Sequence, residues 1–400
     1  MRVSAHGCTQ ENTARISPKS PSGPGLTRSE VRVLVVNAGS SSLKVRLLGH
    51  HDDIIFSSDL PPIKDGSGHA GLSAALAGAA PVDAVGHRIV HGGTRFRAGC
   101  RVDGDVVDSL RALVDLAPLH QPASLSALDA VSRELPDVPA VVCFDTAFHS
   151  TLSPGASTYA VPARWRKEFG VRRYGFHGLS HSYVAKRVAQ MLGRSPQGLR
   201  IVSCHLGAGA SLAAIRDGVC LDTTMGFTPL EGLVMATRSG TVDPGLVLWL
   251  LEHRGLSPRE ISDALENRSG LVALAGTAEM GAVVAAADNG ARDAMLAVDV
   301  YVHRLTASIA AMAAAIGGLD VLVFTGGVGE NAPSIRQRAA ERLGFLGIEI
   351  DPDRNRRERP DADVTASGTT VRCLVVESRE DIQIAAEVRR VLAAGADPPR

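Results

Sequence analysis

The stretch VLVVNAGSSSLKVRLL, residues 33–48, places a small polar turn between two apolar runs. The flanking runs predict two strands. Between them, Gly39 has no Cβ, so the backbone there can approach a ligand closely. Successive backbone N–H groups and the three serine hydroxyls of residues 40–42 can then surround an anion, and Lys44 adds a positive charge. An ordinary hairpin connection is the other interpretation of this turn, so further motifs are needed to choose between the two.

The composition favours a large protein with no general affinity for polyanions. The chain has 400 residues, and its 42 Lys and Arg balance its 42 Asp and Glu, so the formal net charge is zero. A chain of this length typically folds as about two domains. Because a neutral chain exerts no general field that attracts nucleic acid or an acidic membrane, we expect neither among its partners.

The cysteines and the N-terminal region predict a cytoplasmic protein with reduced thiols. The six scattered cysteines include no Cys-x-x-Cys pair, which argues against a disulfide framework or a zinc site. Residues 1–30 contain no apolar segment typical of a secretory signal, and their Ser, Pro, Gly and Thr content predicts a disordered tail. The longest apolar stretch, residues 305–324, is interrupted by Gly317, Gly318 and Asp320. It therefore predicts a core helix, a turn and a buried strand rather than a membrane span.

Strand-like and helical patterns alternate along the chain, which predicts an α/β fold. The strand-like runs cover residues 33–36, 44–48, 84–89, 140–144, 200–205, 211–215, 321–324 and 370–376. The helical patterns cover residues 106–116, 179–192, 244–252, 258–266, 291–315, 335–343 and 381–394. The first hairpin is echoed about 170 residues later by GLRIVSCHLGAGASLAAIRDG. This echo suggests two duplicated halves that face each other across a cleft, although two unrelated hairpins would give the same pattern.

Two further glycine-rich turns favour a nucleotide-binding cleft. HLGAGAS, residues 205–211, repeats the composition of the first turn. FTGGVGEN, residues 324–331, follows a predicted strand and precedes a helix, an arrangement that presents free amide groups toward phosphate. No segment fits G-x-x-x-x-G-K-[ST], and no G-x-G-x-x-G follows a strand within a βαβ unit. The turns therefore indicate a nucleotide cleft that is neither a P-loop nor a dinucleotide-binding fold.

Four charged or titratable residues have the chemistry that phosphoryl transfer requires. Arg88 in VGHRIVHGG and Arg238 in MATRSGTVDPG lie among small residues, and a guanidinium can donate two parallel hydrogen bonds to a phosphate. His177 in YGFHGLSH can donate to a phosphoryl oxygen, and Asp145 ends a predicted strand, where α/β sheets hold their ligands. Surface ion pairs for the arginines, a core or capping histidine and a helix N-cap are the alternative interpretations.

An acidic segment near the C-terminus is a candidate magnesium site. VVESREDIQ contains Glu377, Glu380 and Asp381 between a predicted strand and the last helix. Mg²⁺ usually takes one or two carboxylates together with phosphates and water. One of these acids can supply that ligand, and the others favour the helix N-terminus electrostatically.

The chain resembles the acetate kinases, a family in the superfamily of actin, sugar kinases and actin-like ATPase chaperones. The resemblance covers roughly residues 31–394. It rests on six segments that occur in the family's order: NAGSSSLK, GHRIVHGG, FDTAFH, YGFHGLSH, DTTMGFTPLEGLVMATRSGTVDPG and FTGGVGEN. Each segment is modest evidence alone, but six in register are specific.

The resemblance implies two actin-like (ribonuclease H-like) domains that face a central nucleotide cleft. Residues 31–150 would form the first domain, completed by the C-terminal helix 381–394. Residues 151–380 would form the second domain with the nucleotide loops. The resemblance also implies a cytoplasmic homodimer that reversibly transfers a phosphoryl group between ATP and acetate, giving ADP and acetyl phosphate with Mg²⁺.

Site residues follow from the resemblance position by position. Asp145, His177 and Arg238 are similar to the catalytic residues, Arg88 to the acetate-binding arginine, and Asn37 and Glu380 to the magnesium-site residues. The small apolar pocket for the acetate methyl matches Val90, Leu119 and Pro229, with His120 beside it. The nucleotide contacts match Lys44, His205, Leu206, Gly207, Ala208, Gly209, Glu279, Met280, Gly281, Gly327, Val328, Gly329, Glu330 and Asn331.

The chain departs from the family pattern where the nucleotide would bind. Ala208 stands where relatives usually have asparagine, so a polar contact to the phosphates is lost. Glu279 and Met280 can stand for an aspartate on the ribose hydroxyls and its apolar neighbour, but Gly281 replaces the arginine that lies against the base. These departures make the nucleotide affinity and the preference for ATP open questions.

Three other functions fit parts of the sequence. A kinase for propionate or another short carboxylate would differ in the size of the apolar pocket. A non-catalytic actin-like ATP-binding protein would fit the altered nucleotide segments, but it would have no need of Arg88, Asp145, His177 and Arg238 together. A sugar or polyol kinase would need several polar residues and a catalytic base facing a hydroxyl, whereas this chain offers an apolar pocket and an arginine.

Overall fold

The computed structural model describes residues 31–39, 42–61, 69–78, 81–117 and 121–394. The predictions made for the N-terminal tail 1–30, for the serines 40–41 and for Leu119 and His120 lie outside these residues.

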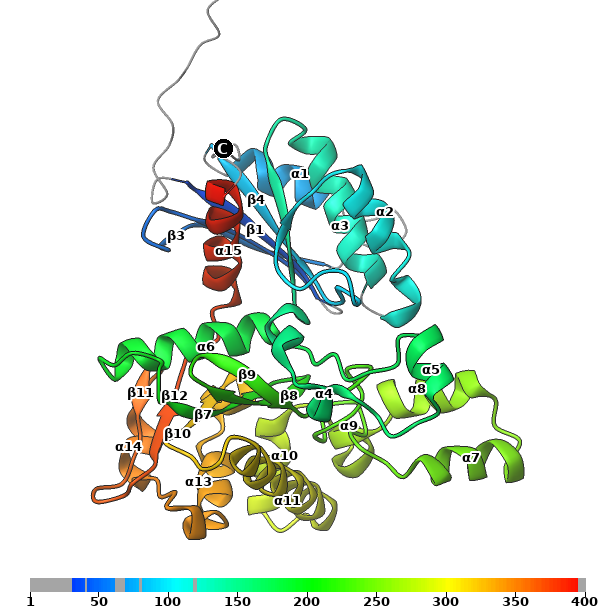
Figure 1. Cartoon of the computed structure of the whole chain (residues 1–400). Helices are drawn as coiled ribbons and strands as arrows, with labels where there is room; N and C mark the ends of the chain where they lie inside the picture. The colour runs from blue at the N-terminus through cyan, green and yellow to red at the C-terminus, as the bar shows by residue number, and fades with distance from the viewer. Residues whose placement is uncertain (1–30, 40–41, 62–68, 79–80, 118–120, 395–400) are drawn as a thin grey trace, which may run out of the picture.

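The first sheet contains the opening hairpin and has the strand order β3-β2-β1-β4-β6-β5 (Figure 1). Its strands are β1 (Val33–Ala38), β2 (Leu43–Leu48), β3 (Ile54–Leu60), β4 (Ala84–Ile89), β5 (Cys100–Arg101) and β6 (Ala140–Phe144). β1, β4 and β6 are parallel, and the hairpin strand β2 runs antiparallel to β1. The carboxyl ends of the three parallel strands therefore meet at one edge of the sheet, where α/β proteins bind ligands.

The second sheet repeats this arrangement, with the order β9-β8-β7-β10-β12-β11. Its strands are β7 (Arg200–Leu206), β8 (Ala210–Arg216), β9 (Val219–Thr223), β10 (Val321–Thr325), β11 (Ala362–Asp363) and β12 (Arg372–Val375). Again three strands, β7, β10 and β12, are parallel, and a hairpin strand, β8, is antiparallel to the first of them. The α/β class and the echo between the two hairpins are thus confirmed as a repeat of the whole sheet.

Helices cover both faces of the first sheet. α1 (His69–Gly78), α2 (Gly104–Arg111), the 3-10 turn η1 (Val114–Leu116) and α3 (Gln121–Glu134) follow its strands in sequence, and α3 packs on one face. The opposite face is covered by α15 (Glu380–Ala394), although this helix comes from the far end of the chain (Figure 1). Ile384, Ala385 and Val388 of α15 are fully buried against the sheet. The return of the C-terminal helix brings its first residue, Glu380, to the inner edge of this sheet.

Helices also cover both faces of the second sheet, and alternate strand residues face each side. α6 (Gly178–Met191) packs Val184 and Val188 against Ile201 and Val323. α11 (Arg292–Ala315) packs on the other face of the sheet. Its buried residues and Val202 of β7 belong to one apolar cluster there. This alternation is expected of a strand buried on both faces.

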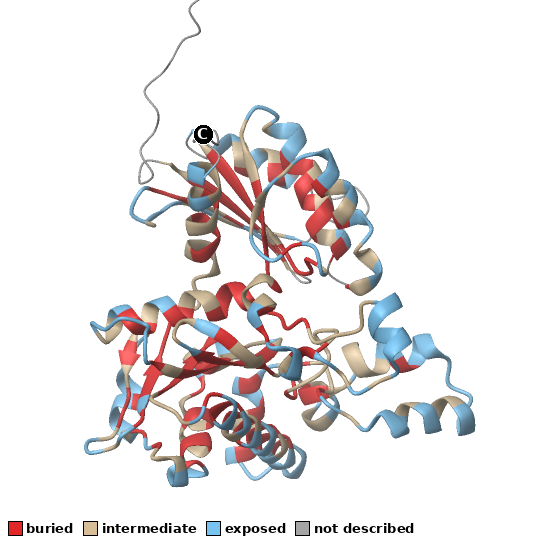
Figure 2. Cartoon of the chain, in the orientation of Figure 1, coloured by how far each residue is buried: buried red, intermediate tan, exposed pale blue. Residues whose placement is uncertain are grey.

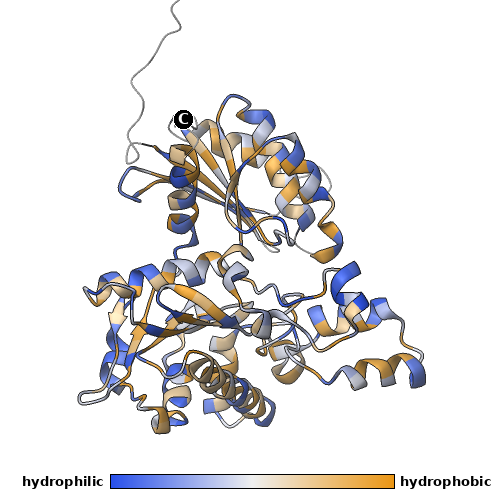
Figure 3. Ribbon diagram, in the orientation of Figure 1, coloured by the Kyte–Doolittle hydropathy of each residue, from blue (hydrophilic) through white to orange (hydrophobic). Residues whose placement is uncertain are grey.

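The second half contains further, mostly short, helices. They are η2 (Ala147–Thr151), α4 (Pro154–Ser157), α5 (Ala163–Glu168), α7 (Pro244–His253), α8 (Pro258–Asn267), α9 (Gly270–Ala275), α10 (Met280–Asp288), α12 (Gly326–Asn331), α13 (Pro333–Glu341), η3 (Gly344–Leu346) and α14 (Pro352–Arg357). Figure 2 shows the strands buried in both halves and the α7–α8 arm exposed. Figure 3 shows the same distribution as hydropathy, with apolar residues gathered along the strands.

Two apolar segments of the second half are long enough to be membrane spans by length and composition. They are Gly270–Asp288 and Arg292–Ala315. In their most apolar stretches of 18 residues, 28% and 44% of the residues are buried inside the protein. The second segment packs its apolar side into the core of the second half. It ends at Ala315, and β10 begins at Val321, so the helix, turn and strand predicted over residues 305–324 are confirmed.

Candidate active site

The two halves of the molecule enclose a cavity of about 560 Å³. Its walls come from the first hairpin, from the ends of β4 and β6, from the turn before α6, from the β7–β8 turn and from the start of α15. Arg88, His177 and Arg238 all line this cavity. Three cationic or hydrogen-bonding side chains from distant parts of the chain therefore face one space.

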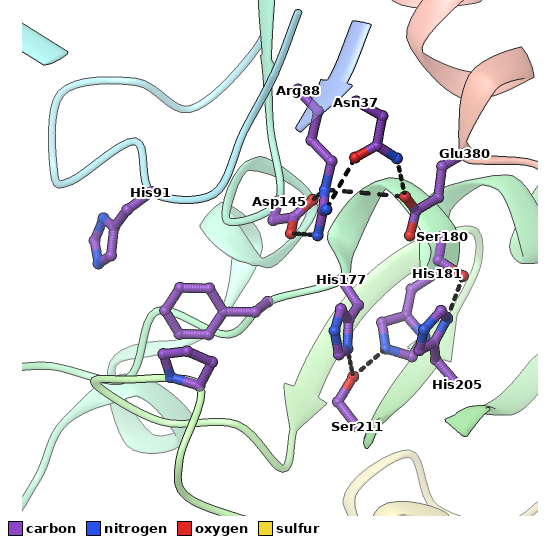
Figure 4. A network of polar contacts seen from close by, with 12 residues as sticks. Asn37, Arg88, His91, Asp145, His177, Ser180, His181, His205, Ser211 and Glu380 are labelled. Carbon is purple, nitrogen blue, oxygen red and sulfur yellow. Dashed lines mark hydrogen bonds and ion pairs between the residues drawn. The ribbon is translucent and has the colours of Figure 1, made fainter. Parts of the chain in front are cut away.

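Arg88 is the centre of a polar cluster on the first-sheet side of the cavity (Figure 4). Its Nε and Nη2 donate to the two oxygens of Asp145 at 3.0 and 2.5 Å. Its Nη1 donates to Asn37 Oδ1 at 3.1 Å, and Asn37 Nδ2 donates to Glu380 Oε2 at 3.0 Å. β1, β4, β6 and α15 each supply one member, so the adjacent parallel strands and the returning helix build the cluster.

Burial and charge pairing determine the ionisation of this cluster. Burial opposes the charge of Arg88, but Asp145 and Glu380 raise the pKa of Arg88 above its ordinary value. Burial raises the pKa of Asp145, and the two hydrogen bonds from Arg88 oppose that shift. For Glu380, burial alone would raise the pKa, but the charge of Arg88 together with the hydrogen bond from Asn37 and other nearby positive charge lowers it. The cluster thus keeps Arg88 cationic and Glu380 anionic at neutral pH.

His177 lies in a strained turn that glycine makes possible. Its φ of 56° falls in the left-handed region, which is uncommon for residues other than glycine. The next residue, Gly178, donates its N–H to the Asp145 carbonyl at 2.9 Å, and a Cβ on Gly178 would lie 2.2 Å from that oxygen. The turn therefore locks the backbone before α6 against the end of β6 and points His177 into the cavity.

Two histidines meet on the second-sheet side of the cavity. The rings of His177 and His205 have centroids 4.4 Å apart and are tilted by 30°. The Nδ1 atom of each ring contacts a serine hydroxyl, Ser211 at 3.0 Å for His177 and Ser180 at 2.8 Å for His205. Burial, together with the nearby charges of His205 and Arg88, lowers the pKa of His177 well below its usual value. Both rings are therefore neutral at physiological pH, because burial also lowers the pKa of His205.

Arg238 approaches the same point from the opposite wall. Its Nη1 donates to the Pro229 carbonyl at 3.2 Å. A Cβ placed on Gly209 would lie 3.5 Å from that Nη1 and 3.2 Å from His177 Nε2. The absence of a side chain at Gly209 thus leaves the ring and the guanidinium facing a common space.

The two glycine-rich turns of the second half lie side by side. A Cβ on Gly207 would lie 4.0 Å from the backbone nitrogen of Gly327. Residues 326–331 form the short helix α12 directly after β10, where an extended turn had been predicted to precede the helix. Glu330 Oε1 accepts from the N–H groups of Gly326 and Ser378 at 2.9 Å each. Its carboxylate therefore ties α12 to the segment before α15.

Comparisons with known proteins agree with this geometry. The sequence profile of the acetokinase family matches residues 73–386. The chain belongs to the acetokinase family. It is 40% identical over 404 residues to the acetate kinase of Trichormus variabilis, an alignment that covers 90% of this chain and 100% of that protein.

Solved structures of acetokinases share the fold over nearly their whole length. The crystal structure of Porphyromonas gingivalis acetate kinase superposes with a TM-score of 0.84 at 35% identity, covering 90% of this chain and 100% of that one. A propionate kinase from Francisella tularensis superposes with a TM-score of 0.83 at 32% identity, with the same coverage. The two actin-like halves expected from the motifs are thus confirmed, and the protein is a phosphotransferase with a carboxyl group as acceptor.

The residues of this acetokinase fit a magnesium ion that also binds nucleotide phosphates. Mg²⁺ prefers oxygen ligands and usually takes one or two carboxylates with phosphates and water. Glu380 offers an ionised carboxylate at the cavity, and Asn37 offers an amide oxygen beside it. The described residues contain no group of three or more His, Cys, Asp or Glu that could hold a metal ion. An ion at Glu380 would therefore depend on ligands from the nucleotide.

Some of the other predicted contacts also line the cavity, but Gly207, Pro229 and the adenosine segment do not. Lys44, Val90, Ala208 and Gly209 belong to its walls. Leu206 and Met280 are buried in the core of the second half, and the other residues assigned to the nucleotide in 279–281 and 327–331 are not among the lining residues. The structure thus brings the residues of the proposed transfer site together. The assignment of residues 279–281 and 327–331 to the nucleotide stays a prediction.

Sequence reasoning missed several residues of this region. Arg46, Phe176 and Arg379 line the cavity. Ser203, His181 and Ser211 form a buried chain behind His177, with contacts of 2.8 to 3.0 Å. His181 stands four residues after His177, a spacing that places two side chains on one helix face. That spacing was the signal by which sequence reasoning could have found His181. Ser203 and Ser211 belong to strands β7 and β8, where no such spacing marks them.

Proposed function

We propose that this acetokinase catalyses the reversible transfer of the γ-phosphoryl group of ATP to acetate, giving ADP and acetyl phosphate, with Mg²⁺. The observation that carries the proposal is that Arg88, Asp145, His177 and Arg238 line one cavity between the two halves. The identity to curated acetate kinases supports acetate as the acceptor.

Arg88 is suited to hold a carboxylate. A guanidinium has five N–H donors, and the hydrogen bonds to Asp145 and Asn37 use one each on Nε, Nη1 and Nη2. One N–H on each of Nη1 and Nη2 is left by this count, and that edge of the guanidinium can take both oxygens of acetate. Asp145 then acts by fixing the orientation of Arg88, and acetate needs no general base because its carboxylate is already ionised at neutral pH.

His177 and Arg238 are suited to stabilise the phosphoryl group in transit. The transition state spreads negative charge over the equatorial oxygens, so fixed donors and cations lower its energy more than that of the bound substrates. The two side chains flank the same space at Gly209. Mg²⁺ at Glu380 would add positive charge to the nucleotide phosphates when bound.

The acceptor pocket favours a small acid but discriminates weakly. Val90 is buried and lines the cavity, and Pro229 stands beside Arg238 through its carbonyl. One additional methylene changes the transition-state energy by about 1–3 kcal/mol in such a pocket. Propionate is therefore the second candidate substrate, and the structural similarity to a propionate kinase favours it over larger acids.

An exposed apolar helix supports a homodimer. α7 has no buried residue, and its Leu248 and Trp249 side chains are 57% and 42% exposed. Exposed apolar patches of this kind mark interaction sites in soluble proteins. A second copy of the chain is the partner that the resemblance implies, and a cytoplasmic location remains the prediction from the sequence.

A hydroxamate assay for acyl phosphate tests the proposed function. The full chain is incubated with Mg²⁺, a panel of nucleoside triphosphates, and acetate, propionate or butyrate. We expect the largest kcat/KM for ATP and acetate, a smaller value for propionate and little for butyrate. Acyl phosphate formation that is absent with every acid, while ATP still binds, would show a non-catalytic nucleotide-binding protein instead.

A further inference from the structure

A buried chain of hydroxyl and imidazole groups runs from Ser203 in the core of the second sheet to His177. Figure 4 shows its outer part, from His181 through Ser211 to His177. Ser211 Oγ lies 3.0 Å from His177 Nδ1 and 2.8 Å from His181 Nε2. His181 Nδ1 lies 2.9 Å from Ser203 Oγ. His181, Ser203 and Ser211 are fully buried, so water does not compete for these contacts. Nothing in the proposed chemistry so far uses the three residues.

The protons of this chain can be ordered in two ways. Each hydroxyl carries one proton, and each neutral imidazole carries one N–H. In the first order, Ser203 donates to His181 Nδ1, His181 Nε2 donates to Ser211, and Ser211 donates to His177 Nδ1. His177 then carries its proton on Nε2. In the reverse order, His177 donates from Nδ1, and its Nε2 presents a lone pair.

The first order matches the chemistry of the cavity. His177 Nε2 is the ring atom beside Gly209, on the cavity wall. A phosphoryl oxygen in that space needs a donor and would be repelled by a lone pair. Burial lowers the pKa of both His177 and His181 well below the usual value, so neither ring provides a donor at both nitrogens. The tautomer of His177 therefore decides whether it can act.

We propose that Ser211, His181 and Ser203 are positioning residues that hold His177 as the neutral tautomer with its proton on Nε2, directed at the transferring phosphoryl group. This inference rests on the proposed phosphoryl transfer. The relay lets His177 donate a hydrogen bond without becoming a cation. A cationic His177 ring would be unfavourable there, because the site is buried and the Arg88 guanidinium is close.

His205 provides a parallel for the arrangement. Its Nδ1 contacts Ser180 at 2.8 Å, and a Cβ on Gly207 would lie 3.8 Å from its Nε2. Both stacked rings thus have a serine hydroxyl at Nδ1 and a glycine near Nε2. The His177 branch differs because Ser211 also contacts His181, which in turn contacts Ser203.

Removing the Ser211 hydroxyl tests the relay kinetically. We expect Ser211→Ala to lower kcat about tenfold or more, since a lost hydrogen bond to a buried group has an effect of this order. The KM values for acetate and ATP should stay within about twofold of wild type, because His177 acts in the transition state. Ser211→Thr keeps the hydroxyl and should recover most of the activity. Ser124→Ala removes another buried serine hydroxyl, one with no hydrogen-bond partner among the described residues, and is the matched control.

Nitrogen NMR of histidine-labelled protein tests the tautomer itself. In the full chain with ADP, Mg²⁺ and acetate, the His177 resonances should show protonated Nε2 and unprotonated Nδ1. Ser211→Ala should shift them toward the other tautomer or a mixture. An unchanged tautomer and unchanged kcat in Ser211→Ala would overturn the relay.

Coupling to His177 separates a positioning role from a structural one. If Ser211 acts through His177, the Ser211→Ala, His177→Ala double variant should be no slower than His177→Ala. Losses that multiply would overturn the proposal. A wild-type chain that forms no acyl phosphate would instead refute the proposed function, so the two failures are distinct.

Discussion

The turn at His177 concentrates several constraints on one backbone segment. His177 adopts a left-handed φ, Gly178 packs its Cα against the Asp145 carbonyl, and His149 Nε2 contacts the Phe176 carbonyl at 2.9 Å. Strained residues of this kind persist where the surrounding structure holds them, and they cluster at active sites. The placement of the imidazole therefore depends on residues that never touch substrate.

Gly178→Ala tests this dependence. The new Cβ would lie 2.2 Å from the Asp145 carbonyl oxygen, so the turn must move away from β6. We expect kcat to fall at least tenfold and Tm to drop by several degrees, in line with a steric change of about 1–3 kcal/mol in a packed site. Gly104→Ala is the matched control, because its Cβ would meet nothing within 4 Å, and it should leave both values unchanged. Normal turnover in Gly178→Ala would mean that the turn is not constrained as described.

Buried histidines make the stability of the fold depend on pH. Burial lowers the pKa of His87, His91 and His149 to about 4, below the value of about 6.5 expected in the unfolded chain. The unfolded state therefore binds protons first as the pH falls, and stability decreases from about pH 6.5 toward pH 4.

Thermal unfolding measured across pH checks this dependence. Tm should be nearly constant between about pH 8 and 7 and should fall progressively below about pH 6.5. His87→Leu removes a buried ring whose two nitrogens have no hydrogen-bond partner in the described part of the chain, so the fall should be shallower in this variant. The exposed His50 gives the control, His50→Leu. A Tm that stays constant down to pH 5 would contradict the buried neutral histidines.

Most of the site residues could be chosen from the sequence, but their mutual geometry could not. Arg88, His177 and Arg238 stood out because each lies among small residues near a predicted strand or helix end. The contact between Asn37 and Glu380 joins residues 343 positions apart, and no local pattern predicts it. Ser203 and Ser211 looked like ordinary strand residues, because their role depends on His181 across the sheet.

Two strands of the first sheet were predicted with the bounds that the structure shows. The predicted strands 84–89 and 140–144 coincide with β4 and β6. The helix predicted over 106–116 ends at Arg111, and a 3-10 turn follows, so that boundary was wrong. The strand predicted over 370–376 is shorter, Arg372–Val375.

Helices without a clear amphipathic pattern were missed. α1 has the sequence HAGLSAALAG, in which small and apolar residues occur on all sides. α12, GGVGEN, has a low intrinsic helix propensity because half of its residues are glycine. Tertiary contacts override that propensity: Glu330 accepts from Gly326 N–H, and Arg336 donates to the carbonyls of Gly329 and Glu330.

The next prediction concerns nucleotide affinity and the turns of the second half. Ala208 lines the cavity, and a Cβ on Gly281 would meet no atom within 4 Å, so both positions can accept larger side chains. We expect Ala208→Asn with Gly281→Arg to lower the KM for ATP, because each restores a polar or cationic contact that the family pattern implies. Each single variant shows which position is responsible. An unchanged KM for ATP would show that the alignment of residues 279–281 with the adenosine site is wrong.

The exposed face of α7 predicts how two molecules associate. Light scattering of the full chain should give about twice the 41.8 kDa of one chain. The double variant Leu248→Glu, Trp249→Glu places two charges on this apolar face and should shift the protein to monomer. Phe345→Glu is the control, since this side chain is 77% exposed, belongs to η3 rather than α7, and should leave the dimer intact. A monomeric wild-type chain, or a dimer that survives both charges, would contradict this interface.

The whole molecule works by bringing two repeated sheets together around one cavity. The first sheet supplies Arg88 and Asp145, and the second half supplies His177 and Arg238. Neither half alone contains both Arg88, the proposed acceptor-binding residue, and the proposed phosphoryl-stabilising pair. Closure of the two halves therefore assembles the site that the account requires.

The most direct measurement is kcat/KM for acetyl phosphate formation by Arg88→Ala and Arg238→Ala. Arg200→Ala is the matched control, because Arg200 also pairs with a carboxylate, Asp320 at 2.7 Å, but lies outside the cavity. We predict a loss of about a hundredfold or more in each cavity variant, the size expected for removing a transition-state charge contact, with wild-type activity in Arg200→Ala. Near-normal kcat/KM in both Arg88→Ala and Arg238→Ala, with the chain still folded, would contradict the account.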